Sequence, residues 1–168
     1  MDLHTILIIA HIIGTILGVG GATLAEINVI TALRDGKVDA SERALMHANY
    51  TMIRVGLAII VLSGIALVWW HLSQGNEWVI TSAKVWFKDL LVIFIIINAV
   101  LLSKHWIALW LGSALSFTAW WMATILGAWR GQPFDFFELL GIFVIAVIVI
   151  AGILEILHRI FIPNFRKK

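Results

Sequence analysis

Charged residues are scarce in this sequence. Asp, Glu, Lys and Arg make up only 13% of the 168 residues, whereas 61% are hydrophobic, and the mean hydropathy is +0.99. Soluble globular domains carry about 25% charged residues and rarely expose large apolar surfaces to water. This scarcity excludes a water-soluble domain and predicts an integral membrane protein.

Cysteine is absent altogether. The chain therefore forms no disulfide, no cysteine-ligated iron–sulfur cluster and no thioether-attached haem. Any metal would be held by histidine, carboxylate or methionine side chains, or would belong to a bound cofactor.

Long apolar runs make up most of the chain. A helix that crosses a bilayer needs ~20 predominantly apolar residues, and five runs reach that length, with only short polar segments between them. We therefore expect an all-α polytopic membrane protein, with five transmembrane helices in one bundle and a single domain over residues 1–168. The expected helices cover residues 3–33, 48–72, 83–103, 106–129 and 136–162.

Basic residues are distributed unevenly between the two ends of these runs. Three lie on the side of the amino terminus, namely Lys84, Lys88 and Arg130. Because loops rich in Lys and Arg stay in the cytoplasm, we expect a bacterial inner-membrane protein with its amino terminus outside and its carboxyl terminus in the cytoplasm. The same bias explains the basic tail, so we expect no nucleic-acid partner. Eight basic residues lie on the opposite side: Arg34, Lys37, Arg43, Lys104, Arg159, Arg166, Lys167 and Lys168.

The first run carries polar residues that a purely lipid-facing helix would not choose. At ~100° per residue, His4, His11 and Glu26 lie at or just beyond the edge of the face that holds Gly14 and Gly18. The opposite face is aliphatic. We expect any functional site to include the small-residue face. The spacing of the two glycines is a helix-packing signal, which serves contacts within the chain or between copies in a homo-oligomer or membrane complex.

Two histidines are candidate ligands of a b-type haem. His11 and His71 fall toward the same membrane side on neighbouring antiparallel helices, and axial ligation needs two imidazoles that face each other across a bundle. We therefore predict haem b, with His11 and His71 as metal ligands, and a role in redox chemistry or electron transfer. His4, one heptad before His11, is an alternative ligand. Two unrelated structural histidines are the other interpretation.

Tryptophan is concentrated toward the outer half of the membrane. Interfacial anchoring explains this distribution. The alternative is that these rings form an aromatic wall around a flat cofactor or a quinone. In that case the protein would have a quinone as a partner, in addition to the lipid bilayer. Seven of the nine tryptophans belong to this group: Trp69, Trp70, Trp78, Trp86, Trp120, Trp121 and Trp129.

Glu26 and Arg54 lie at similar depth in the cytoplasmic half. An intramembrane ion pair between them would offset part of the cost of burying each charge. The alternative is an ion or metal transporter or channel module that uses Glu26 and Arg54, with a proton path that continues through Asn28, Asn49 and Glu155. A non-catalytic subunit of a larger membrane complex is a further alternative.

Three more histidines lie toward the cytoplasmic side. We expect His47, His105 and His158 to be solvated at the rim of the membrane. Glu155 and His158 have the spacing found in di-iron helical bundles, but such a site needs two motifs of this kind together with two further carboxylates, and the sequence has only one such motif, so we do not expect a di-iron site.

Two segments resemble a group of small bacterial membrane proteins. The run AHIIGTILGVGG, which begins at residue 10, resembles the first helix of the copper-resistance D-type domain, of its uncharacterised relatives and of the HemJ-type protoporphyrinogen oxidase. The pattern Lys88-Asp-Leu-Leu-Val resembles the third helix of the HemJ type. The resemblance implies that His11 is associated with haem b and that Lys88 is a cofactor-site residue associated with activity. Because Asn98 stands where the HemJ pattern has a histidine, the resemblance is closest to the uncharacterised branch.

Overall fold

The computed structural model describes residues 1–32 and 38–161, and in these ranges every regular element is a helix. Five of the helices described there are long and apolar enough to cross a membrane, whereas α3 is a single turn. This confirms the expected all-α architecture with five spanning helices. The elements are α1 (Leu3–Ala32), α2 (Ala40–Ser73), α3 (Trp78–Thr81), α4 (Ala83–Ser103), α5 (Leu109–Ala128) and α6 (Phe136–Phe161).

The largest difference from the expected boundaries is at the start of α2, which begins at Ala40 rather than at residue 48. Asp39 caps this helix, since its carboxylate accepts a hydrogen bond from the Glu42 backbone N–H at 2.7 Å. The Glu42 carboxylate accepts one in return from the Asp39 backbone N–H at 2.9 Å. This reciprocal capping stabilises a polar first turn that hydropathy alone does not reveal.

Smaller differences occur at the other helix ends. The helix α3 lies in a segment that we expected to be a loop, and α5 begins at Leu109 rather than at residue 106. His105, in the turn between α4 and α5, has a φ of 57°. This left-handed backbone conformation does not continue a helix, so α4 ends just before it. The ends expected at residues 33 and 162 lie outside the described residues, as do the basic residues of 33–37 and 162–168.

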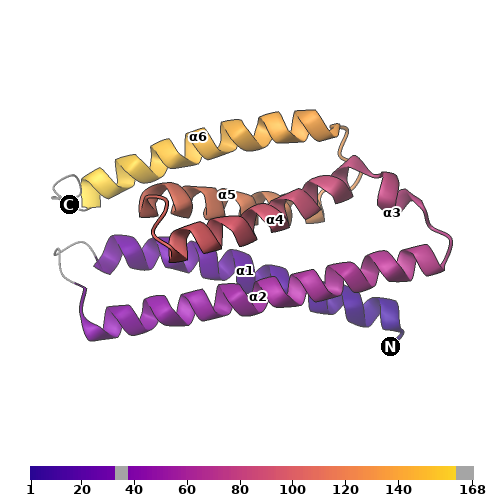
Figure 1. Cartoon of the computed structure of the whole chain (residues 1–168), viewed down its shortest axis with the longest axis horizontal. Coiled ribbons are helices and arrows are strands. Elements are labelled where there is room, and N and C mark those ends of the chain that lie inside the picture. The colour runs from indigo at the N-terminus through magenta and orange to yellow at the C-terminus, as the bar shows by residue number, and fades with distance from the viewer. Residues whose placement is uncertain (33–37, 162–168) are drawn as a thin grey trace.

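The long helices run back and forth along the long axis of the molecule (Figure 1). As a result, α1 begins at one end of the molecule and α6 ends at the other. The helix α2 packs mainly on α1 and contributes Ile60 to the core, whose other residues come from α1, α4, α5 and α6. The carboxyl-terminal ends of α1 and α6 therefore lie at the same end of the molecule (Figure 1).

The close packing of α1 depends on its glycines. A Cβ atom on Gly56 of α2 would lie 2.7 Å from the Gly18 backbone nitrogen and 2.8 Å from the Gly14 carbonyl oxygen. On the side of α1 that faces α5, a Cβ on Gly18 would overlap the indole of Trp120, a core residue with 1% exposure. The Gly14–Gly18 motif therefore serves contacts within this chain, where it lets two neighbouring helices approach α1.

Candidate functional site

A carboxylate and an imidazole are buried together between the first and last helices. Glu26 of α1 is 5% exposed and His158 of α6 is 2% exposed, and Glu26 Oε2 lies 3.8 Å from His158 Nε2. Ionisable groups inside a membrane are costly, and they generally mark a functional site. This pair, with its two fully buried protonatable side chains, is the strongest candidate site in the part of the chain that the structure describes.

The helical repeat explains why these two side chains point inward. Glu26 follows Ala22 by one turn and precedes Val29 on the buried face of α1. His158 follows Leu154 by one turn on the buried face of α6. The two helices meet near their carboxyl-terminal ends, so the side chains come together within the last two turns of each helix.

Polar groups of α2 lie near the same end. Asn49 is 8% exposed, and its backbone oxygen faces Gly21, just over one turn before Glu26. Its amide Nδ2 has no hydrogen-bond partner among the described residues. The Tyr50 side chain is close enough to Glu26 to interact with it electrostatically. The site therefore holds a carboxyl and an imidazole, and Asn49 is a buried polar residue of α2 near the same end of the bundle.

The structure corrects two expectations about this region. Among the described residues, Glu26 and Arg54 form no ion pair, because Arg54 is exposed on the outer face of α2. Its neighbour Ile53 is the residue that packs against α1, at Gly21, and one step along a helix turns the side chain by about 100°. His158 was expected to be solvated at the rim, but it is buried and takes the place expected for Arg54. His47 and His105 are exposed, as expected.

His11 lies in the other half of α1, where it faces α2. Its Nδ1 is 3.0 Å from the Ser63 hydroxyl oxygen, and its ring packs beside Gly64. Lys88 of α4 is half-buried and close enough to interact with His11 electrostatically. The structure therefore places His11 and Lys88, the two residues of the family resemblance, in one region.

His71 is placed next to His4 and not next to His11. The rings of His4 and His71 meet edge to face, with centroids 5.4 Å apart. Trp70 stacks on His4 at 4.1 Å, and Trp78 of α3 contacts His71 at 5.2 Å. These four aromatic rings form a cluster at the end of the bundle where α1 begins.

The positions of His11 and His71 do not fit a haem held between them. Metal–imidazole bonds of about 2.0 Å place the two nitrogens of an axial pair about 4 Å apart. His11 contacts Ser63, which precedes His71 by eight residues, or about 12 Å along α2. In residues 1–32 and 38–161, no group of three or more His, Asp or Glu side chains is arranged to hold a metal ion.

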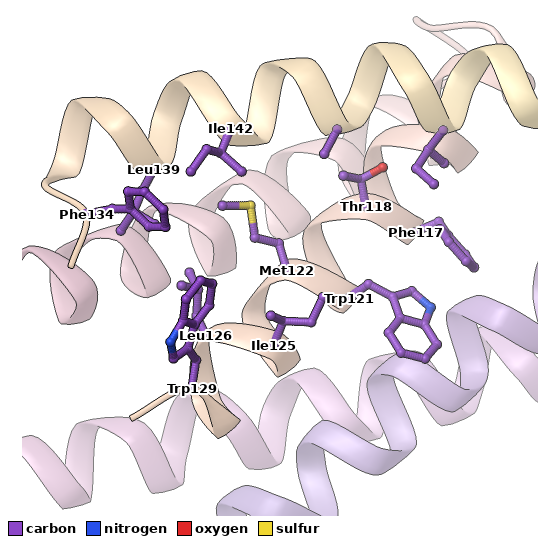
Figure 2. Close-up of a pocket in the computed structure, with 12 residues that line it drawn as sticks. Phe117, Thr118, Trp121, Met122, Ile125, Leu126, Trp129, Phe134, Leu139 and Ile142 are labelled. Carbon is purple, nitrogen blue, oxygen red and sulfur yellow. The ribbon is translucent and has the colours of Figure 1, made fainter. Parts of the chain in front are cut away.

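An apolar groove lies between α5 and α6 (Figure 2). Its volume is about 360 Å³, and aromatic rings from α5 and from the segment before α6 form much of its wall. Two polar groups in the wall are engaged within the protein: the Thr118 hydroxyl donates to the Ala114 carbonyl, and the Trp121 indole N–H donates to the Thr23 hydroxyl. The groove is lined by Phe117, Thr118, Trp121, Met122, Ile125, Leu126, Trp129, Phe134, Leu139, Ile142, Ala146 and Ile150.

Comparisons with protein families, with curated proteins and with solved structures find no match to this chain. The resemblance to the copper-resistance D and HemJ group therefore stays a prediction, and the function has to be inferred from the geometry.

Proposed function

We propose that this protein translocates protons across a bacterial inner membrane and that the Glu26–His158 pair carries the proton. The observation that supports the proposal most strongly is the burial of both side chains at 3.8 Å from each other, between two helices that can span a membrane. A purely structural contact at this position would be better served by apolar side chains, because a buried ion pair is often less stabilising than a hydrophobic replacement.

The pair holds one proton in either of two ways. Glu26 protonated beside neutral His158 can convert to a Glu26 carboxylate beside an imidazolium when the two side chains close from 3.8 Å to hydrogen-bond distance and the proton passes from the carboxyl oxygen to the ring nitrogen. Each form keeps the pair neutral overall, so a proton moves between the two groups without leaving a net charge in the apolar interior. A second proton, or the loss of the first, creates a net charge that favours exchange with water.

Protonatable groups stand in both halves of α1. Glu26 lies about 22 Å from His11 along the helix axis. Between them the polar residues of α1 are Thr15 and Thr23, whose hydroxyls donate to carbonyls of their own helix. We infer that a proton does not hop through this middle section and that translocation involves a rearrangement of the tightly packed α1–α2 seam. With the amino terminus outside, the Glu26–His158 pair belongs to the cytoplasmic half.

The proposal is tested by proton flux into liposomes that contain the purified protein and a trapped pH-sensitive dye. A potassium diffusion potential, negative inside, should acidify the lumen faster than in protein-free liposomes. Glu26→Gln should reduce the rate to that of protein-free liposomes, because the amide cannot release a proton. Glu77→Gln is the matched control, since Glu77 is exposed at the other end of the bundle. A wild-type rate equal to that of protein-free liposomes would overturn the proposal.

A haem-linked redox role stays a prediction. Of its expected residues, His11 and Lys88 lie in one region, whereas His71 is paired with His4. The mechanism proposed for Glu26 and His158 does not depend on haem, on a quinone or on a redox partner.

A further inference from the structure

Four polar side chains form a stripe along the first half of α2. Successive members are separated by four, three and four residues, which places them within about 60° of one another around the helix. All of them are exposed. The members of this α2 polar stripe are Arg43, His47, Tyr50 and Arg54.

No helix of the described chain covers this stripe. In residues 1–32 and 38–161, α2 packs on α1 and makes only slight contact with the other helices. The residues that face α1 include Ile53 and Gly56, and the stripe is centred about 120° away from them around α2. Within the same ranges, neither Arg43 nor Arg54 forms an ion pair. The two guanidinium groups therefore face outward without a counter-charge from this part of the protein.

The length of α2 places the stripe at a membrane surface. Its 34 residues span about 50 Å, whereas the hydrocarbon core of a bilayer is about 30 Å thick. With Trp70 at the outer interface, about 20 residues of helix cross this core and reach the inner boundary at Tyr50. His47 then lies in the headgroup region, with Arg43 just beyond it. Arg54 lies about 6 Å deeper, and because long side chains in a helix point toward its amino terminus, the guanidinium extends back toward the headgroups.

The same side of α2 becomes apolar beyond the stripe. Ala58, Val61 and Ile65 follow Arg54 at helical spacing, and Ile65 is 65% exposed. This side of the helix thus presents cations and hydrogen-bond donors at the level of the headgroups and aliphatic surface at the level of the acyl chains. The order matches that of a phospholipid molecule lying against the helix.

We propose that the α2 polar stripe binds an anionic phospholipid, such as phosphatidylglycerol, in the cytoplasmic leaflet. The Arg54 guanidinium has the planar fork of N–H donors that suits two phosphate oxygens. The Tyr50 hydroxyl and a His47 ring N–H are further donors for the same headgroup, and Arg43 adds positive charge at its rim. This inference rests on insertion in the membrane and not on proton translocation.

The surrounding charges favour an anionic headgroup over a zwitterionic one. At the start of α2, the carboxylates of Asp39 and Glu42 are engaged by backbone N–H groups of the capping box. The Glu26 carboxyl is close to Tyr50, but it is buried and lies beside His158. A cationic stripe attracts a lipid with a net negative charge, whereas the ammonium group of a zwitterionic lipid offsets part of that attraction.

The test measures lipid binding to the detergent-solubilised protein by native mass spectrometry, with phosphatidylglycerol and phosphatidylcholine that have the same acyl chains. The wild type should bind phosphatidylglycerol with the lower Kd. Arg54→Gln should raise this Kd about fivefold, the effect of one arginine at a lipid surface. Arg43→Gln, farther from the membrane, should raise it less. Arg159→Gln is the matched control and should leave the Kd unchanged, because Arg159 lies at the same end of the bundle but is paired with Glu155 at 2.9 Å.

Equal Kd values for the two lipids, or a Kd for phosphatidylglycerol that Arg54→Gln leaves unchanged, would overturn the inference. An excess of inorganic phosphate should not displace the lipid, and displacement would assign the stripe to a soluble anion instead. Thermal unfolding verifies that Arg54→Gln folds, as expected for an exposed residue. The proton-flux measurement is independent of these results, so the two proposals fail separately.

Discussion

Glu26 and His158 come from opposite ends of the chain, yet their side chains lie 3.8 Å apart inside the bundle. This contact connects the first helix with the last near the end of the bundle where both helices finish. Under the proposed function, this contact would link proton exchange at the site to the position of α6 relative to α1.

The pair should contribute to stability in a coupled way. Removing one partner of a buried polar contact typically costs about 1–3 kcal/mol, because the remaining group loses an interaction that water cannot replace. We expect Glu26→Gln and His158→Gln each to lower the free energy of unfolding in detergent, and we expect the double variant to lose less than the two single losses added together. Arg54→Ala should change it little, since Arg54 is exposed. Additive losses at Glu26 and His158 would show that the two residues do not interact.

Sequence reasoning found one half of this site and missed the other. Glu26 stood out as a carboxyl within an apolar run, but Arg54 was chosen as its partner because the two residues lie at similar depth. Depth follows from the count of residues, whereas the direction of a side chain depends on the rotation of each helix against its neighbours. Here, a rotation of α2 by the angle between two successive residues decides whether Ile53 or Arg54 faces α1.

A signal for His158 was nevertheless present. His158 lies one turn after Leu154, and Leu154 lies three turns after Phe143, so the three side chains share one face of α6. A histidine at this spacing faces the same neighbours as the apolar residues. The five spans, in contrast, followed directly from run length and hydropathy, because the bilayer imposes the same minimum length on each helix.

The glycine contacts between α1 and α2 should tolerate no added methyl group. Gly56→Ala would place a Cβ against backbone atoms of Gly14 and Gly18, which cannot move aside as a flexible side chain can. Overpacking of this kind costs typically about 1–3 kcal/mol, and we expect a lower midpoint of thermal unfolding in detergent. Gly152→Ala is the control, since a Cβ there meets no atom within 4 Å. Equal midpoints for the two variants would contradict the packing described for α1 and α2.

The membrane orientation can be measured independently of the function. A reporter fused after Lys104, between α4 and α5, should be active in the cytoplasm. One inserted at Gly75, between α2 and α3, should be active outside. The two turns lie at opposite ends of the bundle, so the reporters must give opposite results if the five long helices span the membrane (Figure 1). The reverse assignment would place the Glu26–His158 pair in the outer half.

The positions of the histidines also predict how the protein should respond to haem. The His11 imidazole is engaged by Ser63 through Nδ1, and His71 is enclosed by His4, Trp70 and Trp78. Because Ser63, the residue that His11 contacts, precedes His71 by about 12 Å along α2, we expect that one iron cannot bind both imidazoles. We therefore expect that no low-spin b-type band in protein purified from haem-replete cells depends on both His11 and His71, and we expect His11→Ala and His71→Ala to be expressed at similar levels. A reduced spectrum with sharp b-type bands that disappear in both variants would show that α1 and α2 take another register when haem is bound. It would also favour redox chemistry over proton translocation by Glu26 and His158.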